Sequence, residues 1–133
     1  MNRGAKTAAF DIEPDVCICI DVCESFDTVG ANKRGEAILG DGAVILAKTS
    51  DHCADPALCK TAREAAENGG IRYKTCVYPE KTSGASLISA SGKGVPCITL
   101  AVPARNIGSG AEVFDMSDAE NVLKLVCAMC NDM

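Results

Sequence analysis

Asp21 is the residue of this sequence that is best placed for chemistry. It interrupts the run Val16-Cys17-Ile18-Cys19-Ile20-Asp21-Val22-Cys23, in which every other residue is apolar or carries sulfur. Such a run is typical of a strand buried on both faces of an α/β sheet. Ligands of open α/β sheets bind outside the carboxyl ends of the strands, so this carboxylate is a candidate metal ligand or catalytic group. The alternative is structural: an aspartate that caps a loop or pairs with a lysine.

Cysteine is a second possible source of chemistry, because this chain of 133 residues contains nine cysteines. Alternate side chains of a strand share one face, and a candidate cluster for a soft metal ion or for redox chemistry therefore consists of Cys17, Cys19, Asp21 and Cys23. The odd number of cysteines, and their positions in predicted strands and helices, favour reduced thiols packed as small core residues. Both interpretations stay open from the sequence alone.

The remaining candidate groups have weaker patterns. His52 is the only histidine, and it lies in a predicted loop between acidic and cysteine neighbours. A second histidine three or four residues away is missing, which favours a solvated loop residue over a metal ligand. Cys127 and Cys130 form a C-x-x-C motif near the C-terminal end of a predicted helix, where the helix dipole raises the pKa of a thiol. The glycines of 91–94 and 108–110 lack the spacing of a phosphate-binding loop.

Alternating strands and helices must position these side chains. Hydrophobic periodicity and turn residues predict strands at 16–22, 43–47, 73–78 and 96–102, helices within 1–10 and at 56–68, 83–91 and 117–131, and a long surface loop at 24–42. This alternation predicts one α/β domain over residues 1–133, a three-layer α/β/α arrangement with a mixed, largely parallel sheet. The apolar run at 16–22 is expected at the centre of that sheet.

Two of the predicted helices have recognisable boundaries. Asp55 supplies an N-cap for the first and Pro56 suits its first turn, while Gly69-Gly70 ends it. Ser117 and Glu120 have the spacing of a capping box at the start of the last helix. These local signals set the expected ends of both helices.

Composition excludes several classes of partner. The chain is 47% hydrophobic with a net charge of -5, which supports a globular domain and argues against nucleic acid or an anionic membrane as partner. No apolar run approaches the roughly 20 residues that span a bilayer. The polar start Met1-Asn2-Arg3-Gly4 lacks the apolar core of a signal peptide. A cytoplasmic location is therefore expected.

Short motifs also follow one another in a familiar order. They are Arg3-Gly-Ala-Lys-Thr-Ala-Ala9, Pro14-Asp15, Ile20-Asp21-Val22, Asp27-Thr-Val-Gly30, Leu39-Gly-Asp-Gly42, Gly94-Val-Pro96, Val102-Pro-Ala-Arg105, Ser109, Glu112-Val113 and Asp118-Ala-Glu-Asn121. In order and spacing they resemble the C-terminal half of the catalytic domain of the two-metal aminopeptidases. That family includes glutamyl, deblocking and tetrahedral aminopeptidases, some of them labelled cellulase M.

The resemblance implies a set of metal ligands, most of which this chain does not show. In the family two histidines, a bridging aspartate, a glutamate and a further aspartate hold the metals, and another glutamate is the general base. Asp21 matches the further aspartate. The final histidine belongs to an Arg-x-x-His-Ser motif, where Arg105 is present but Gly108 stands in place of the histidine. The family's Gly-Thr-Asp-Ala appears as Thr82-Ser83-Gly84-Ala85, with Gly84 in place of the acidic residue. The other ligands, and the insert that supports oligomerisation, would lie upstream of Arg3.

Three hypotheses follow. The first is a degenerate aminopeptidase-like module without catalysis of its own, acting as a binding or scaffold protein. The second is half of a split two-metal aminopeptidase, completed by another chain that carries the other ligands. The third is a cysteine-based metal or redox protein that uses Cys17, Cys19, Cys23 and His52. No catalytic residue and no cofactor is expected in the chain alone, and zinc or cobalt only if a partner supplies ligands. The expected partner is a second copy or a complementary protein chain.

Overall fold

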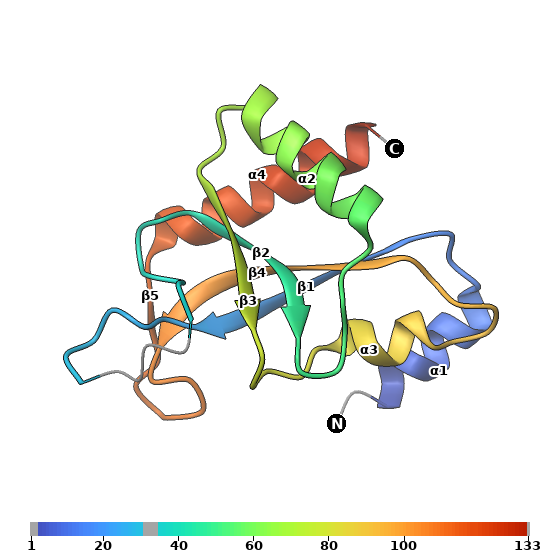
Figure 1. Cartoon of the computed structure of the whole chain (residues 1–133), viewed down its shortest axis with the longest axis horizontal. Coiled ribbons are helices and arrows are strands. Elements are labelled where there is room, and N and C mark those ends of the chain that lie inside the picture. The colour runs from blue at the N-terminus through green and yellow to red at the C-terminus, as the bar shows by residue number, and fades with distance from the viewer. Residues whose placement is uncertain (1–2, 31–34, 133) are drawn as a thin grey trace.

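The chain forms an α/β domain in the computed structural model, which describes residues 3–30 and 35–132 (Figure 1). Its elements in chain order are α1 Arg3–Ile12, β1 Cys17–Glu24, β2 Ala43–Thr49, α2 Pro56–Asn68, β3 Tyr73–Tyr78, α3 Gly84–Ser89, β4 Cys97–Arg105, β5 Val113–Phe114 and α4 Met116–Asp132. No helix in these two ranges is long and apolar enough to cross a membrane.

The strands form one mixed sheet in the order β1-β4-β2-β3, with the short β5 added to β4. β1 runs parallel to β4 and β2 runs parallel to β3, whereas β2 and β4 are antiparallel to each other. β4 therefore lies inside the sheet, and seven of its nine residues are buried. The fold class expected from the sequence is confirmed.

The expected position of the first strand was wrong. β1 lies at an edge of the sheet and pairs only with β4 among the described residues. Ile20 is 63% exposed and Val22 is 36% exposed, so the strand is not buried on both faces. An apolar run shows that a strand has hydrophobic faces, but its composition carries no information on its neighbours. The central place belongs to β4, whose pairing partners are far apart in the chain.

Helices α2 and α4 cover one face of the sheet, as the upper layer of Figure 1 shows. Ile45 of β2 and Ile98 and Leu100 of β4 are buried there against Ala62 of α2 and Leu125 of α4, among other residues. Their alternation along each strand places one apolar face toward the helices. This face carries the largest hydrophobic core of the domain.

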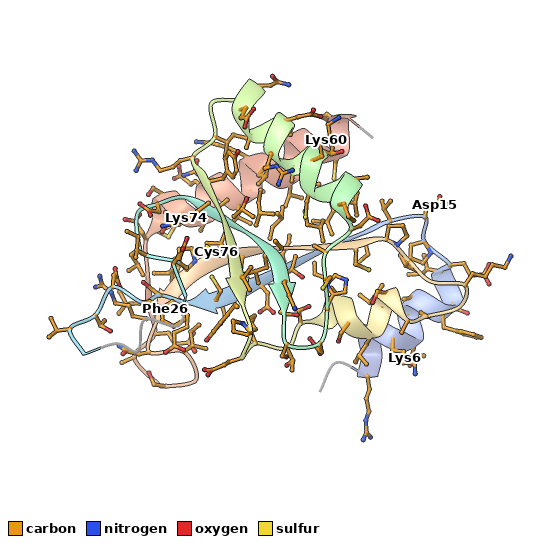
Figure 2. The ribbon with its side chains drawn as sticks, viewed as in Figure 1. Lys6, Asp15, Phe26, Lys60, Lys74 and Cys76 are labelled. Carbon is orange, nitrogen blue, oxygen red and sulfur yellow. The ribbon has the colours of Figure 1, made fainter. Side chains whose placement is uncertain are left out.

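The opposite face is covered in two parts. At one end, α3 packs on the thiol-rich start of β1 and β4 through Ala85 and Ile88, and α1 packs on α3. At the other end, the β1–β2 loop contributes buried Ala37, and the ring of Phe26 packs edge-on against Tyr78 with their centroids 5.5 Å apart. Figure 2 labels Phe26 and Cys76 in this part of the molecule. Together the two faces give the three-layer arrangement.

Most boundaries predicted from local signals agree with the structure. The helix at 56–68 and the strand at 73–78 have the expected ends, and the Asp55 carboxylate accepts hydrogen bonds from the backbone of Ala57 and Leu58. The capping box at Ser117 was wrong. Asp115 caps α4 instead, because its carboxylate accepts a 2.8 Å hydrogen bond from the Ser117 amide and its carbonyl accepts one from Asp118.

A buried carboxylate ties the long β1–β2 loop to α4. Asp118 is completely buried, and its two oxygens accept hydrogen bonds of 2.8 Å from the amides of Gly40 and Gly42. Gly42 has a φ of +96° and lies directly against the Arg72 backbone. The glycines let the backbone turn tightly toward Asp118, so the last part of the loop is fixed just before β2 begins.

Candidate functional site

Asp21 points to the sheet face opposite α2 and α4, where its carboxylate forms an ion pair. The Lys81 ammonium lies 3.1 Å from Asp21 Oδ2, and the Val22 amide donates a 2.8 Å hydrogen bond to Oδ1. The backbone of Lys81 is fixed by Ser50, because the Lys81 carbonyl accepts hydrogen bonds from the amide and the hydroxyl of Ser50. The Lys81 side chain is only 17% exposed. The structural alternative for Asp21, a carboxylate paired with a lysine, is the arrangement present.

The segment after Lys81 crosses the same face of the sheet. Ser83 is buried, and its hydroxyl lies 3.4 Å from that of Thr99 on β4. Gly84 then begins α3. The structure therefore brings Asp21 and the segment that contains Gly84 to one face, although about 60 residues separate them in sequence.

A second ion pair lies at the carboxyl end of β4. Arg105, the last residue of β4, donates hydrogen bonds of 2.8 and 2.6 Å to the two oxygens of Asp27. Ser25 and the Leu39 amide also donate to this carboxylate. The bidentate pair fixes the start of the β1–β2 loop against β4. Sequence reasoning placed both residues in motifs but did not predict their contact.

The pH dependence of stability provides a test of this pair. The hydrogen bond from Arg105 holds the pKa of the Asp27 carboxyl well below its ordinary value of 3.8. A depressed folded-state pKa contributes stability above pH 3.8 that is lost as the pH falls below that value. We expect Arg105→Ala to lower the melting temperature at pH 7, and we expect its difference from the wild type to narrow as the pH falls from about 4 toward 2. Thermal melts across this range measure the difference. Lys124→Ala, which breaks an exposed pair with Glu120, serves as control and should have little effect at either pH.

Gly108 lies away from the sheet, in the exposed turn between β4 and β5. Its φ is +82°, a conformation that favours glycine, and its amide donates a hydrogen bond to the Glu112 carboxylate. A side chain at this position would meet open space but would strain the backbone. The local backbone therefore suits the glycine of this sequence better than the histidine of the Arg-x-x-His-Ser motif.

The cysteines divide into separate groups. Cys17 and Cys19 face each other with 3.7 Å between their sulfur atoms, and buried Cys97 of β4 pairs in register with Cys17. Cys23 shares their face but lies in another buried cluster with Cys76. The candidate four-residue cluster is therefore divided. Sequence reasoning missed Cys97, although strand pairing brings it opposite Cys17.

The remaining sequence candidates do not join these groups. His52 is half-buried, and burial lowers the pKa of its imidazole below the ordinary value. Cys127 and Cys130 are exposed on the last turns of α4. Across residues 3–30 and 35–132, no group of three or more histidine, cysteine, aspartate or glutamate side chains is arranged to hold a metal ion.

The sheet order and the covering helices define a mixed α/β domain, and a solved aminopeptidase shares this fold. The solved structure of aminopeptidase APDkam598 from the archaeon Desulfurococcus kamchatkensis matches 97% of this chain with a TM-score of 0.92 and 32% sequence identity. Residues 2–125 match the M42 glutamyl aminopeptidase family, and the chain belongs to that family. The resemblance inferred from the order of motifs is confirmed.

Two curated relatives show how much of a whole enzyme the chain represents. A putative aminopeptidase of Acetivibrio thermocellus is 33% identical over 129 residues, which are 96% of this chain and 39% of that protein. The lysyl aminopeptidase of Pyrococcus furiosus is 29% identical over 134 residues, covering 98% of this chain and 37% of that protein. The match to APDkam598 covers 37% of that chain. The chain therefore spans less than two fifths of the length of these proteins.

Proposed function

We propose that this chain is an aminopeptidase-like module that has no peptidase activity by itself and acts by binding another protein. One observation carries the first part: the carboxylate of Asp21 is paired with the Lys81 ammonium at 3.1 Å. A cation ligated by Asp21 would have to approach that ammonium closely. Charge repulsion and the loss of the ion pair both oppose this.

The number of ligands supports the same proposal. A catalytic zinc site uses about three protein ligands and a water, and two metals about 3.5–4 Å apart need several carboxylates and imidazoles to offset their repulsion. Asp21 is the residue here that matches a ligand position of the family, while Gly84 and Gly108 stand at positions where the family has side chains that bind or catalyse. The residues present do not fit a pair of zinc or cobalt ions.

Metal analysis together with an activity assay tests this proposal. The wild type and Asp21→Ala are dialysed against zinc or cobalt, analysed for bound metal, and assayed with aminoacyl p-nitroanilides. We expect equal metal content and no turnover in either chain. Zinc held by thiols persists in Asp21→Ala, so the comparison measures only metal that depends on the aspartate. Turnover by the wild type that Asp21→Ala abolishes would overturn the proposal.

The exposed edge of β1 supports the binding role. Ile20 and Val22 of β1, and Val16 just before it, lie on one side of this strand with exposed fractions of 63%, 36% and 39%, and no described strand pairs with the outer edge of β1. Soluble proteins normally protect such edges with charges, proline or a covering segment. Charged side chains occur on both edge strands, Asp21 and Glu24 on β1 and Lys74 on β3. The β1 edge exposes more apolar surface, at Val16, Ile20 and Val22 against Val77 on β3, which points to β1 as the surface that another polypeptide covers.

We assign this edge to a complementary chain that carries the rest of the aminopeptidase architecture. The relatives have more than three fifths of their length outside the matched region, so a large part of their structure has no counterpart in this chain. An extended segment paired with β1 would satisfy its free amides and carbonyls and cover Ile20. In this arrangement the chain is one half of a split aminopeptidase-like assembly, and a metal site there would require Asp21 to be released from Lys81.

Co-expression with a polypeptide that carries the family's two histidines, bridging aspartate and paired glutamates tests this second function. A stable complex is expected with the wild type and is lost in Ile20→Asp. Val77→Asp, on the opposite edge strand, where Val77 is 53% exposed against 63% for Ile20, should leave it intact. Peptidase activity of the complex would favour a split enzyme, and an inactive complex a scaffold. A stable dimer of this chain alone that Ile20→Asp dissociates would identify a second copy as the occupant.

A further inference from the structure

Three thiols meet at the start of the sheet, on the face covered by α3. Cys17 and Cys19 of β1 have their sulfur atoms 3.7 Å apart, and Cys97 of β4 is the register partner of Cys17. Ala85 and Ile88 of α3 pack beside them. Cys17 and Cys19 remain partly exposed, whereas Cys97 is buried and donates to the Val95 carbonyl at 3.2 Å.

The sulfur atoms of Cys17 and Cys19 are close enough to share one hydrogen bond. Either thiol can donate in this contact. The hydrogen bond with Cys19 lowers the pKa of Cys17 from 9.0 to about 7 against the opposing effect of burial. Since the thiolate is the reactive form, Cys17, whose pKa is lowered, is the nucleophile of the pair.

We propose that Cys17 and Cys19 form a dithiol site that a hydroperoxide oxidises reversibly to an intrachain disulfide. The Cys17 thiolate attacks one oxygen of hydrogen peroxide. The O–O bond breaks, which gives a sulfenic acid on Cys17 and a hydroxide ion. The Cys19 sulfur then attacks the Cys17 sulfur, so the S–S bond forms as the S–O bond breaks. The hydroxyl of the sulfenic acid takes up the proton of Cys19 and leaves as water. The two sulfurs lose two electrons in total, which reduce the peroxide.

The Cα separation is compatible with this bond once β1 puckers to bring the two Cβ atoms together, and it disfavours the alternative with Cys23. Two residues along a strand span about 6.6 Å between their Cα atoms, within the upper limit of roughly 6.8 Å for a disulfide. Six residues along a straight strand exceed that limit about threefold, which separates Cys17 from Cys23. The outer side of β1 pairs with no described strand, so its backbone can pucker locally without breaking a second row of hydrogen bonds.

The test uses a chain in which the exposed thiols Cys53, Cys127 and Cys130 are replaced by serine, leaving the pair in place. After treatment with hydrogen peroxide, the peptide that contains β1 should be lighter by two hydrogen atoms, and dithiothreitol should reverse this. Fragmentation in the mass spectrometer assigns the bond. Cys19→Ser should abolish it and leave a sulfenic acid on Cys17 that dimedone traps. Cys23→Ser should retain the bond.

A pH profile separates a redox pair from two packed thiols. In the unoxidised chain, alkylation of Cys17 by iodoacetamide should be half-maximal near pH 7, and Cys19→Ala should move this midpoint toward 9.0. Alkylation at pH 7 then falls by more than about tenfold. Circular dichroism checks that the variants fold. An absent disulfide in the wild type, or an unchanged midpoint in Cys19→Ala, would overturn the proposal, and a Cys17–Cys97 bond would overturn the assignment of Cys19.

Discussion

Replacing Asp118 with alanine should lower the free energy of unfolding by about 3 kcal/mol. The carboxylate is completely buried and accepts the amides of Gly40 and Gly42 at 2.8 Å each. Alanine leaves both donors without this acceptor, and the Gly42 amide is the more buried of the two. The negative charge in the first turn of α4, which suits the helix dipole, is lost as well.

Urea denaturation measures this effect, and two further variants define its origin. Asp118→Asn keeps one acceptor oxygen but turns an amide group toward the other donor, so about half of the loss is expected. Glu120→Ala on the same helix breaks only an exposed pair with Lys124 and should cost less than about 1 kcal/mol. An Asp118→Ala chain as stable as Glu120→Ala would show that water replaces the buried contacts.

Gly42→Ala should be strongly destabilising, at about 4 kcal/mol. A Cβ atom would overlap the backbone carbonyl of Arg72, and the φ of +96° is unfavourable for any L-residue with a side chain. Relief requires β2 and β3 to separate where their pairing begins, at Ala43 and Tyr73. The overlap therefore weakens the sheet itself.

Gly92→Ala is the matched control for this substitution. Gly92 also has a positive φ, of +55°, but a Cβ there would meet no atom within 4 Å. It should cost about 1 kcal/mol, the price of the backbone conformation alone. Denaturant midpoints of the two variants give the difference directly. Equal losses in both would mean that the close approach to Arg72 relaxes at little cost.

Local signals in the sequence predicted the elements well, but not their neighbours. The limits of α2 follow from Asp55, Pro56 and the glycines after Asn68, all of which act within one or two turns of the chain. The place of β1 depends instead on which strand pairs with it. Composition cannot specify that, because β1 and β4 are both apolar. The two-residue β5 is too short for any periodic pattern, and it was missed.

In the candidate site too, the sequence indicated individual residues but not the contacts between them. Asp21 was identified as the charged interruption of an apolar strand, and pairing with a lysine was one of its two interpretations. Lys81, which makes that pair, lies about 60 residues later in a loop without a motif of its own. The Asp27–Arg105 pair joins residues 78 positions apart. Such contacts depend on the folded topology, and spacing along the chain does not reveal them.

The pairing of β1 also sets the order in which the chain folds. β2, α2 and β3 form a contiguous parallel unit whose paired residues are about 30 positions apart, so their loops close early. Cys17 of β1 pairs with Cys97, which lies roughly 80 residues later in the chain. During synthesis β1 remains without its strand until β4 has left the ribosome. The strand that carries Asp21 and the dithiol can therefore join the sheet only after β4 is available.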